Sequence, residues 1–196
     1  MTVQRCPHKA KIRSGVLALR DAIPVDQRIE KSLALSAHGG RELVVGPNDI
    51  VSGFWPIRSE VDVRPLMADL RDQGARLCLP VIVDRETIIF RELLRGAPMV
   101  DTGFGTAGPA DDAAVLDPTL MLVPLAAFDA RGHRVGYGAG LYDRAISRLV
   151  ARHIRPRLVG IAFDLQEVEG VPDEDHDELL DAVLTESGLR CFAPSI

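Results

Sequence analysis

The chain has 196 residues, of which 46% are hydrophobic, 26% charged and 5% aromatic. This composition is typical of soluble domains and argues against disordered, fibrous and membrane-spanning proteins. A formal net charge of -5 argues against a sequence-independent nucleic-acid-binding protein, which would need a basic surface. We therefore expect one domain over residues 1–196, a monomer or weak dimer with no nucleic-acid or membrane partner.

The cysteines and the first residues indicate the compartment. Cys6, Cys78 and Cys191 form no CxxC pair, so neither a zinc site nor a dithiol centre is expected. The start MTVQRCPHKAKIRSG lacks the apolar segment of a signal peptide. Both features predict a reduced, cytoplasmic protein.

The first half of the chain alternates helical and strand patterns. Apolar residues at helical spacing predict a helix over residues 9–20, a second over 27–37 ended by Gly39 and Gly40, and a third over 64–73. Apolar runs predict buried strands over 49–55, 76–83 and 87–93. A stretch rich in Gly, Ala, Pro and Asp over 95–117 predicts a long loop, and loops of that length are often functional.

The second half continues the alternation. We expect a buried strand over 119–129, a glycine-rich turn, a helix over 141–153 and a buried strand over 157–164. A short helix over 176–184 and an edge strand near the end complete the chain. The fold class is therefore α/β, a Rossmann-like three-layer αβα domain with a mostly parallel sheet and helices on both faces.

Charge is segregated along the chain. Residues 5–20 contain basic side chains and no acid, whereas residues 164–186 contain carboxylates and no Lys or Arg. Lys9, Arg13 and Arg20 share one helix side, because their offsets correspond to rotations of about 40° and 20°. The stripe borders the apolar face, so it is either a solvated basic face or a site for a polyphosphate.

A glycine-rich turn, Gly136-Tyr137-Gly138-Ala139-Gly140, separates a strand from a helix. Glycines allow successive N–H groups to point at one anion, and the start of the next helix favours negative charge. The spacing is neither GxGxxG nor the Walker pattern, so an ordinary tight turn remains the alternative. Asp143, in the first helical turn, complements the helix dipole or holds Mg²⁺ beside a bound phosphate.

Glu60 follows an apolar strand, where ligands of α/β sheets usually bind; the alternative is an ordinary surface glutamate. Phe54 and Trp55 are more typical of a core than of a stacking platform. Phe104 lies in the glycine-rich segment GFGTAGP, where little core is available to it. The acidic run VPDEDHDELLD is consistent with a solvated helix start, and His176 alone does not indicate a metal site.

Four blocks together resemble the 5-formyltetrahydrofolate cyclo-ligase family, also called methenyltetrahydrofolate synthetases, over nearly the whole chain. The strongest is VPLAAFDARGHRVGYGAGLYDR at residues 123–144, which is similar to the family's strand, AFD and LGYGGGYYDR-like phosphate loop. FWPIRSEVDVRPL and GIAFDLQEVEGVPDEDHDELLDAVLTE look like two further blocks, and Lys9 with Arg13 resembles its K-x-x-x-R.

The resemblance implies conversion of 5-formyltetrahydrofolate to 5,10-methenyltetrahydrofolate, with Mg²⁺ as cofactor and ATP as co-substrate. The formyl oxygen would attack the γ-phosphate, and ring closure would then release phosphate. Such chemistry depends on positioning and charge compensation more than on a protein nucleophile. The alternative is a non-catalytic folate- or nucleotide-binding paralogue.

Residue roles follow from the same resemblance. Catalysis is assigned to Arg134, Tyr142 and Arg144. ATP binding is assigned to Lys9, Arg13, Arg134, Gly136, Tyr137, Gly138, Ala139, Gly140, Tyr142 and Asp143. Folate binding is assigned to Phe54, Trp55, Glu60, Phe104 and Tyr142, and metal binding to Asp143 and Asp177. Because burying a carboxylate without a partner is costly, Glu60 of an empty site should either be solvated or have a raised pKa.

Three departures from the family pattern bear on activity. Ala139 replaces a glycine of the phosphate loop, Leu141 replaces an aromatic residue, and TAGP at residues 106–109 replaces IPEP. Ala139 is compatible with activity if its backbone is right-handed, since a positive φ would cost it about 1 kcal/mol. The glutamate missing at Gly108 would either alter how the glutamate tail or the nucleotide is held or mark a relative with a shifted substrate.

Overall fold

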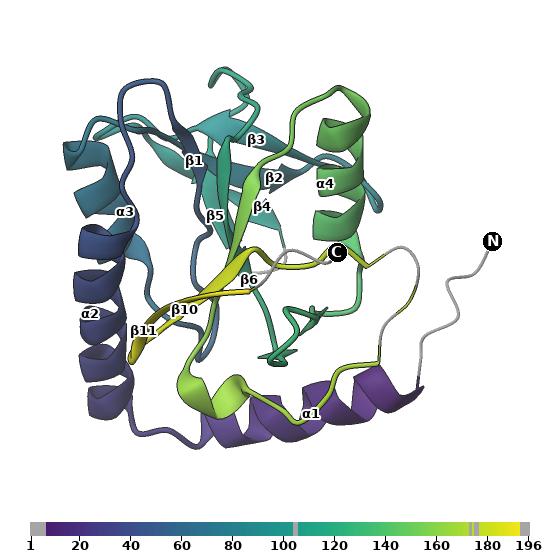
Figure 1. Cartoon of the computed structure of the whole chain (residues 1–196). Coiled ribbons are helices and arrows are strands. Elements are labelled where there is room, and N and C mark those ends of the chain that lie inside the picture. Colours follow the sequence, from purple (N-terminus) through teal and green to yellow (C-terminus); the bar gives the residue numbers. More distant parts are fainter. Residues whose placement is uncertain (1–6, 104–105, 173, 175–176, 193–196) are drawn as a thin grey trace.

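A computed structural model describes residues 7–103, 106–172, 174 and 177–192. Its centre is a seven-stranded sheet in the order β11-β10-β9-β6-β1-β2-β3 (Figure 1). In chain order these strands are β1 (Ile50–Ser52), β2 (Arg76–Ile82), β3 (Ile88–Glu92), β6 (Leu120–Pro124), β9 (Arg157–Ile161), β10 (Ala182–Thr185) and β11 (Gly188–Cys191). All neighbours pair in parallel except β2 with β3 and β10 with β11. The expected α/β class with a mostly parallel sheet is confirmed.

Helices cover both faces of the sheet (Figure 1). They are α1 (Pro7–Asp21), α2 (Val25–Glu42), α3 (Arg64–Asp72), α4 (Leu141–Ala151) and the 3₁₀ helix η1 (Asp164–Gln166). Strand β6 shows why two layers of helices are needed. Leu120 and Leu122 join the core that contains residues of α2 and α3, whereas Met121 and Val123 join the core that contains residues of α4. Alternate side chains of one strand are therefore buried on opposite faces.

Helix α1 does not belong to either layer. It runs beneath the sheet and contacts η1 and the small hairpin of β7 (Ala127–Phe128) and β8 (Arg134–Val135) (Figure 1). Val16 is buried there with Ala127 and Val135. Because β7 follows β6 and η1 follows β9, α1 lies across the carboxyl ends of these central strands. The basic stripe of the sequence is thereby carried to the edge where α/β sheets bind ligands.

The second helix does not end at Gly39 and Gly40, as expected, but continues to Glu42. A Cβ atom at Gly39 would lie 2.7 Å from side-chain carbons of both Leu66 and Leu184. This glycine therefore allows α2 to pack closely on α3 and β10, and it is not a helix terminator.

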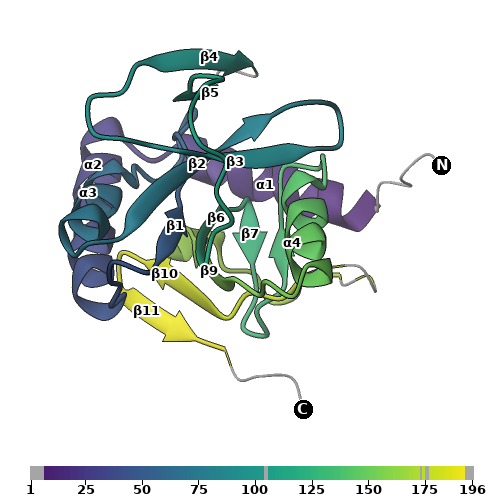
Figure 2. The same ribbon diagram turned by 90° about the horizontal axis from the view of Figure 1, so that it is seen from above.

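Four segments differ from the sequence prediction, and for residues 176–184 the reason is that a short apolar run is compatible with a helix or a buried strand. The helix expected over 176–184 was wrong: Ala182–Thr185 is the fully buried strand β10. The loop expected over 95–117 contains the hairpin of β4 (Met99–Gly103) and β5 (Thr106–Pro109), which lies beside β2 and β3 (Figure 2). The strand expected over 119–129 divides into β6 and β7, and that over 49–55 is shortened to β1. The final edge strand, β11, is confirmed.

The strand order reverses between β1 and β6, which is where α/β sheets usually bind ligands. From β1 the chain proceeds through β2 to β3 in one direction, and from β6 through β9 to β10 in the other. A crevice forms outside the carboxyl ends of parallel strands where the order reverses in this way. Glu60 follows β1, and the glycine-rich turn follows β6 by way of the β7–β8 hairpin. None of the helices in the described ranges is long and apolar enough to cross a membrane.

Candidate active site

The basic helix and the glycine-rich turn meet through Arg13. Its Nε donates a hydrogen bond of 2.6 Å to the carbonyl oxygen of Gly136. A Cβ atom at Gly138 would lie 3.3 Å from the Arg13 guanidinium. Residues more than a hundred positions apart in the chain therefore lie side by side, and their use as one binding site stays a prediction.

The backbone of the turn explains its glycines. Gly138 has φ +96° and Gly140 has φ +64°, both in the left-handed region that L side chains rarely adopt. Ala139 is absent from the positive-φ residues of the described chain, which are Arg58 and His153 apart from glycines. The positive φ that would strain Ala139 is therefore absent, and the effect of this departure on activity stays a prediction.

Because Gly138 has a positive φ and Ala139 does not, substitutions at these two neighbouring positions should differ in their effect on stability. Gly138→Ala is expected to lower the free energy of unfolding by about 1–2 kcal/mol, because it forces an L residue to a positive φ. Ala139→Gly should cost less than about 1 kcal/mol, through unfolded-chain entropy alone. Urea denaturation of both variants measures these values, and equal losses would contradict the backbone assignment.

Lys9 connects the basic and acidic segments of the chain. Its ammonium donates hydrogen bonds to Asp177 Oδ2 at 2.5 Å and to Glu174 Oε2 at 3.2 Å. Partial burial lowers the pKa of Lys9, but the bonds to these two carboxylates outweigh it and hold the pKa above its usual value. The basic segment 5–20 and the acidic segment 164–186, which are separate in the sequence, are therefore joined in the fold by the ion pairs of Lys9.

Arg20, the third residue of the stripe, is buried and connects the turn to Glu60. Its Nη1 donates to the Tyr137 hydroxyl at 2.8 Å and its Nε to Ser59 Oγ at 3.0 Å. Tyr137 is hydrogen-bonded in turn to the carboxylate of Glu60, which also accepts the Ile57 N–H at 2.9 Å. The sequence placed Arg20 on the stripe but assigned it no role; its position on the same helix side was the available signal.

Burial raises the pKa of Glu60 above its usual value of 4.5, although bonds from Tyr137 and Ile57 and the charge of Arg20 act in the opposite direction. The raised pKa was expected for an empty site. The folded protein keeps the Glu60 carboxyl protonated to a higher pH than the unfolded chain does. The free energy of unfolding therefore falls as the pH rises from 4.5 through the raised pKa.

Glu60→Gln should remove this loss of stability with rising pH, because glutamine does not titrate. The free energy of unfolding of the variant relative to the wild type is expected to increase with pH across this window, by at most about 1.4 kcal/mol per pH unit. Urea denaturation over a pH series measures the difference, and a difference independent of pH would contradict the raised pKa.

Arg134, Asp143 and Arg144 surround the start of α4. The guanidinium of Arg134, which is 8% exposed, donates to Asp143 Oδ1 at 2.5 Å and to the carbonyl oxygen of Glu178. Arg144 donates to the carbonyl oxygens of Ala139 at 2.8 Å and Glu86 at 2.9 Å. Arg144 therefore fixes the turn to α4 and to the β2–β3 connection, while Arg134 orients the Asp143 carboxylate.

The carboxylates proposed as metal ligands lie in separate ion pairs, Asp143 with Arg134 and Asp177 with Lys9. Across the described ranges no three His, Cys, Asp or Glu residues gather as a metal-binding group. Mg²⁺ commonly takes only one or two protein carboxylates and completes its shell with phosphate oxygens and water. Asp143, which is 29% exposed and at the glycine turn, fits such a site; Asp177 fits it only if Lys9 releases it.

The residues expected to bind folate do not all lie together. Trp55 and Glu60 line one groove, whereas Phe54 is buried in the core cluster that also contains Met67 and Val51 and does not line the groove. Tyr142 packs against the α4 core, and its hydroxyl is buried without a hydrogen-bond partner among the described residues. Burial raises its pKa, so the hydroxyl is neutral at ordinary pH. Phe104 lies outside the described residues.

Asp129, in the AFD of the strongest sequence block, had no assigned role. Its buried carboxylate accepts N–H groups of Arg131 at 2.9 Å and Val171 at 3.0 Å, and pairs with the Arg131 guanidinium. Burial alone would raise its pKa, but these bonds hold it below the usual value. Asp129 therefore ties the β7–β8 hairpin to the segment that leads to Glu174.

Comparison with known proteins places the chain in a family. The model of the 5-formyltetrahydrofolate cyclo-ligase family matches residues 5–186. The chain belongs to this family. The 5-formyltetrahydrofolate cyclo-ligase of Escherichia coli K12 is 32% identical over 143 residues, which cover 70% of this chain and 78% of the relative. The cyclo-ligase of Mycolicibacterium smegmatis is 28% identical over 185 residues, which cover 90% and 93% of the two chains.

A solved structure agrees with this cyclo-ligase membership. The 5,10-methenyltetrahydrofolate synthetase of Aquifex aeolicus superposes with a TM-score of 0.76 at 26% identity, and the match covers 96% of this chain and 94% of that chain. The family expected from the sequence is confirmed, and so is its fold. The individual residue roles stay predictions.

Proposed function

We propose that this cyclo-ligase family member converts 5-formyltetrahydrofolate and ATP to 5,10-methenyltetrahydrofolate, ADP and phosphate, with Mg²⁺ as cofactor. One observation carries the proposal beyond the family match: Arg13 of α1 is bonded to Gly136 and lies against Gly138. A cation of α1 thus lies beside the glycine turn, and this neighbourhood supports a polyphosphate site.

The triphosphate of ATP is held from two sides. Lys9 and Arg13 supply positive charge from α1, and the N–H groups of residues 136–140 supply donors beside the start of α4. Tyr137, Ala139 and Tyr142 complete the nucleotide side of the site through their backbone or ring. Lys9 must exchange its bonds with Asp177 and Glu174 for phosphate oxygens, so nucleotide binding would loosen the acidic segment.

Mg²⁺, when bound, neutralises phosphate charge and fixes the oxygens of the transferred group. Asp143 is its proposed protein ligand, since Arg134 already orients the carboxylate. Asp177 would join once it is released from Lys9. Arg134 and Arg144 provide fixed positive charge beside the transferred group.

The reduced folate lies on the Glu60 side. Glu60 accepts donors from the pterin ring, and the unpartnered Tyr142 hydroxyl donates to a polar atom of the substrate, which would remove a buried unsatisfied group. The formyl oxygen then attacks the γ-phosphorus and ADP leaves. The amine nitrogen N10 of the folate then attacks the formyl carbon, loses its proton and closes the ring as phosphate leaves. The protein holds the two substrates in line and excludes water, with no covalent intermediate on the chain.

The direct test combines the purified protein with MgATP and 5-formyltetrahydrofolate, and follows methenyl-folate absorbance together with ADP release. Equal amounts of the two products are expected. ADP without methenyl-folate, or neither product despite measurable folate binding, would demote the chain to a folate- or nucleotide-binding paralogue.

Lys9→Ala is expected to raise the KM for MgATP about tenfold through loss of one charge-assisted phosphate contact, with a smaller effect on kcat. Lys11→Ala is the matched control, because Lys11 is exposed on the same helix. Steady-state kinetics over an ATP series measures both. An unchanged KM for ATP in the Lys9 variant would remove Lys9 from the site.

A further inference from the structure

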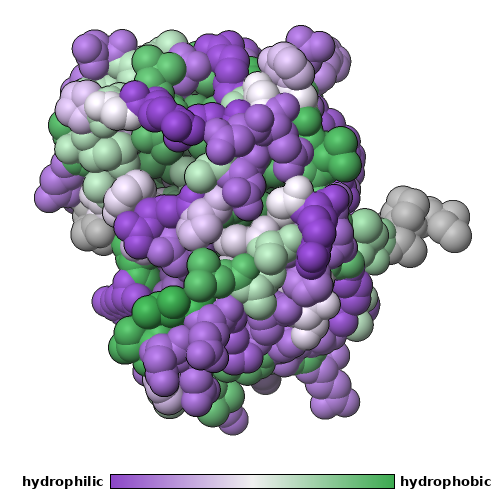
Figure 3. All heavy atoms as spheres, turned by 90° about the vertical axis from the view of Figure 1, so that its left-hand side faces the viewer, coloured by the Kyte–Doolittle hydropathy of each residue, from purple (hydrophilic) through white to green (hydrophobic). Residues whose placement is uncertain are grey.

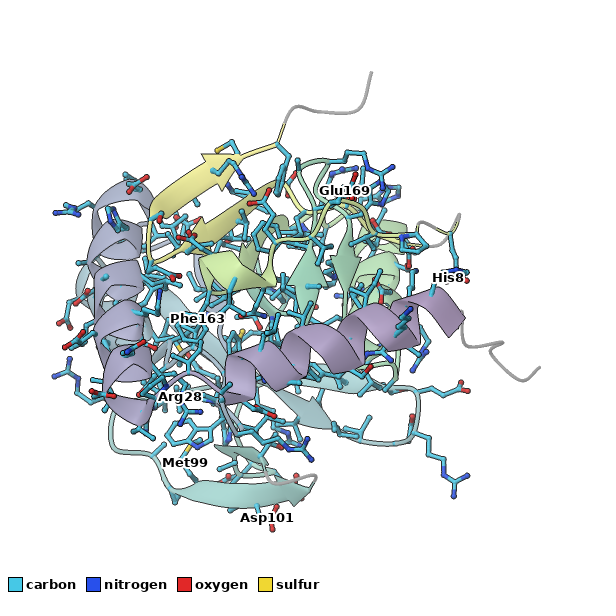
Figure 4. The ribbon with its side chains drawn as sticks, turned by 90° about the horizontal axis from the view of Figure 1, so that it is seen from below. His8, Arg28, Met99, Asp101, Phe163 and Glu169 are labelled. Carbon is cyan, nitrogen blue, oxygen red and sulfur yellow. The ribbon has the colours of Figure 1, made fainter. Side chains whose placement is uncertain are left out.

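Helix α1 holds the glycine-rich turn at two successive residues. Figure 4, seen from below, shows α1 running from His8 across the lower edge of the sheet, with η1 on one side and the hairpin of β4 and β5 on the other. Arg13 donates to the Gly136 carbonyl oxygen. Arg20, two helical turns further along, donates to the Tyr137 hydroxyl at 2.8 Å. The position of the turn is therefore set from α1 through both its backbone and a side chain.

Arg20 is a buried cation that is bonded to hydroxyl groups. It is 2% exposed and makes no ion pair with any carboxylate in the part of the chain that the structure describes. Its Nε donates to Ser59 Oγ at 3.0 Å, and Ser59 donates in turn to the Asp21 carboxylate. A buried charge is costly to leave without partners, so Arg20 holds the Tyr137 hydroxyl firmly.

The Tyr137 hydroxyl connects Arg20 to Glu60. Its oxygen accepts the bond from Arg20, and its proton is donated to the Glu60 carboxylate. A tyrosine hydroxyl has one proton, so a guanidinium on its oxygen turns that proton toward a second group. Glu60 also accepts the Ile57 N–H at 2.9 Å. In the protein without substrates, this carboxylate is therefore already engaged from two sides.

Both substrates of the proposed reaction would disturb the bond between Tyr137 and Glu60. A pterin ring that donates a pair of hydrogen bonds to Glu60 needs the acceptor position that Tyr137 occupies. A phosphate bound by N–H groups of residues 136–140 draws the turn toward itself. Tyr137 lies inside that turn, between Gly136, whose carbonyl oxygen is held by α1, and Gly138, whose φ is +96°. The bond is broken only once, so the substrate that breaks it first makes binding of the second easier.

We propose that the Tyr137 hydroxyl couples the nucleotide site to the folate site, with Arg20 as its positioning residue, so that each substrate binds more tightly when the other is present. The inference rests on the proposed function, because it needs a pterin at Glu60 and a phosphate at the glycine-rich turn. The factor by which nucleotide increases folate affinity must equal the factor by which folate increases nucleotide affinity. One charge-assisted hydrogen bond corresponds to a factor of about ten.

The test measures the Kd of 5-formyltetrahydrofolate with and without a non-hydrolysable analogue of MgATP, by equilibrium titration of the full chain. The wild type should bind the folate about tenfold more tightly with the analogue present, and the analogue about tenfold more tightly with the folate present. An active wild type with equal Kd values in both conditions would overturn this inference alone. Tenfold coupling without turnover would overturn only the proposed reaction.

Tyr137→Phe keeps the ring and removes the hydroxyl, so that no bond to Glu60 has to be broken. Without nucleotide, the variant should bind folate about as tightly as the wild type binds it with the analogue present. Its coupling factor should fall to near one. Damage to the fold would weaken binding and could not produce this gain of affinity. Weaker folate binding with the wild-type coupling factor would contradict the proposed role of the hydroxyl.

Arg20→Lys retains the buried charge but cannot hold Ser59 and Tyr137 in the fixed geometry of a guanidinium, so the coupling factor should fall severalfold. Tyr137→Phe leaves the buried cation in place and decides the question even where Arg20→Lys does not fold. Arg41→Lys is the matched control. Arg41 is exposed near the end of α2, on the face of α2 and α3 over which Figure 3 shows hydrophilic side chains spread among apolar ones. This control should retain the wild-type coupling factor, and an equal loss in both arginine variants would overturn the role of Arg20.

Discussion

Asp143→Asn is expected to lower kcat by about a hundredfold, the scale on which enzymes lose rate when one charge-stabilising group is removed. The amide keeps the shape of the side chain and still accepts a hydrogen bond from Arg134, but it loses the charge that would hold Mg²⁺. The apparent KM for Mg²⁺ should rise in parallel. Steady-state kinetics over a magnesium series measures both quantities.

Stability measurements distinguish this effect from a structural one. Arg134 keeps its bond to the Glu178 carbonyl, so the free energy of unfolding of Asp143→Asn should fall by only about 1–2 kcal/mol. Asp117→Asn is the matched control, because Asp117 also pairs with an arginine, Arg152 at 2.6 Å, but at another place in the fold. A kcat for Asp143→Asn within threefold of the wild type would exclude Asp143 as the metal ligand.

Glu60→Gln is expected to raise the KM for 5-formyltetrahydrofolate between about tenfold and a hundredfold. A carboxylate accepts a pair of pterin donors through charge-assisted bonds worth about 1.5–3 kcal/mol each, whereas a glutamine amide turns a donor toward one of them. The KM for ATP should be unchanged, since Glu60 lies on the folate side.

Glu92→Gln serves as the control for the Glu60 variant, because it changes a glutamate that pairs with Arg76 on the sheet. Parallel titration of 5-formyltetrahydrofolate without ATP gives the affinity directly. Equal folate affinities in wild type and Glu60→Gln would remove Glu60 from the pterin site and leave its raised pKa as a property of the empty fold.

The layered fold could be predicted because its strongest patterns are local. Strands buried on both faces appear as continuous apolar runs, and α1, α3 and α4 have clear helical spacing. Residues 182–184 could not be placed in the same way, because a short apolar run is compatible with a helix or a buried strand until a sheet neighbour is known. Gly39 was misread for a related reason: its role is contact with Leu66 and Leu184, which no local pattern contains.

The candidate site was predictable as far as it depended on residue type and motif. Lys9, Arg13 and the glycine turn came from charge, periodicity and family resemblance, and the structure places Arg13 against the turn. The partners of these residues were not predictable. The bond of Lys9 to Asp177 and the bond of Arg20 to Tyr137 each join segments that are distant in the chain.

A crystal structure with Mg²⁺ and a non-hydrolysable ATP analogue tests the convergence of α1 and the glycine turn most directly. The account predicts phosphate oxygens within hydrogen-bond distance, about 3 Å, of Lys9 or Arg13 on one side and of backbone N–H groups of residues 136–140 on the other. A nucleotide bound elsewhere, with Lys9 still paired to Asp177 and the turn empty of phosphate, would contradict it.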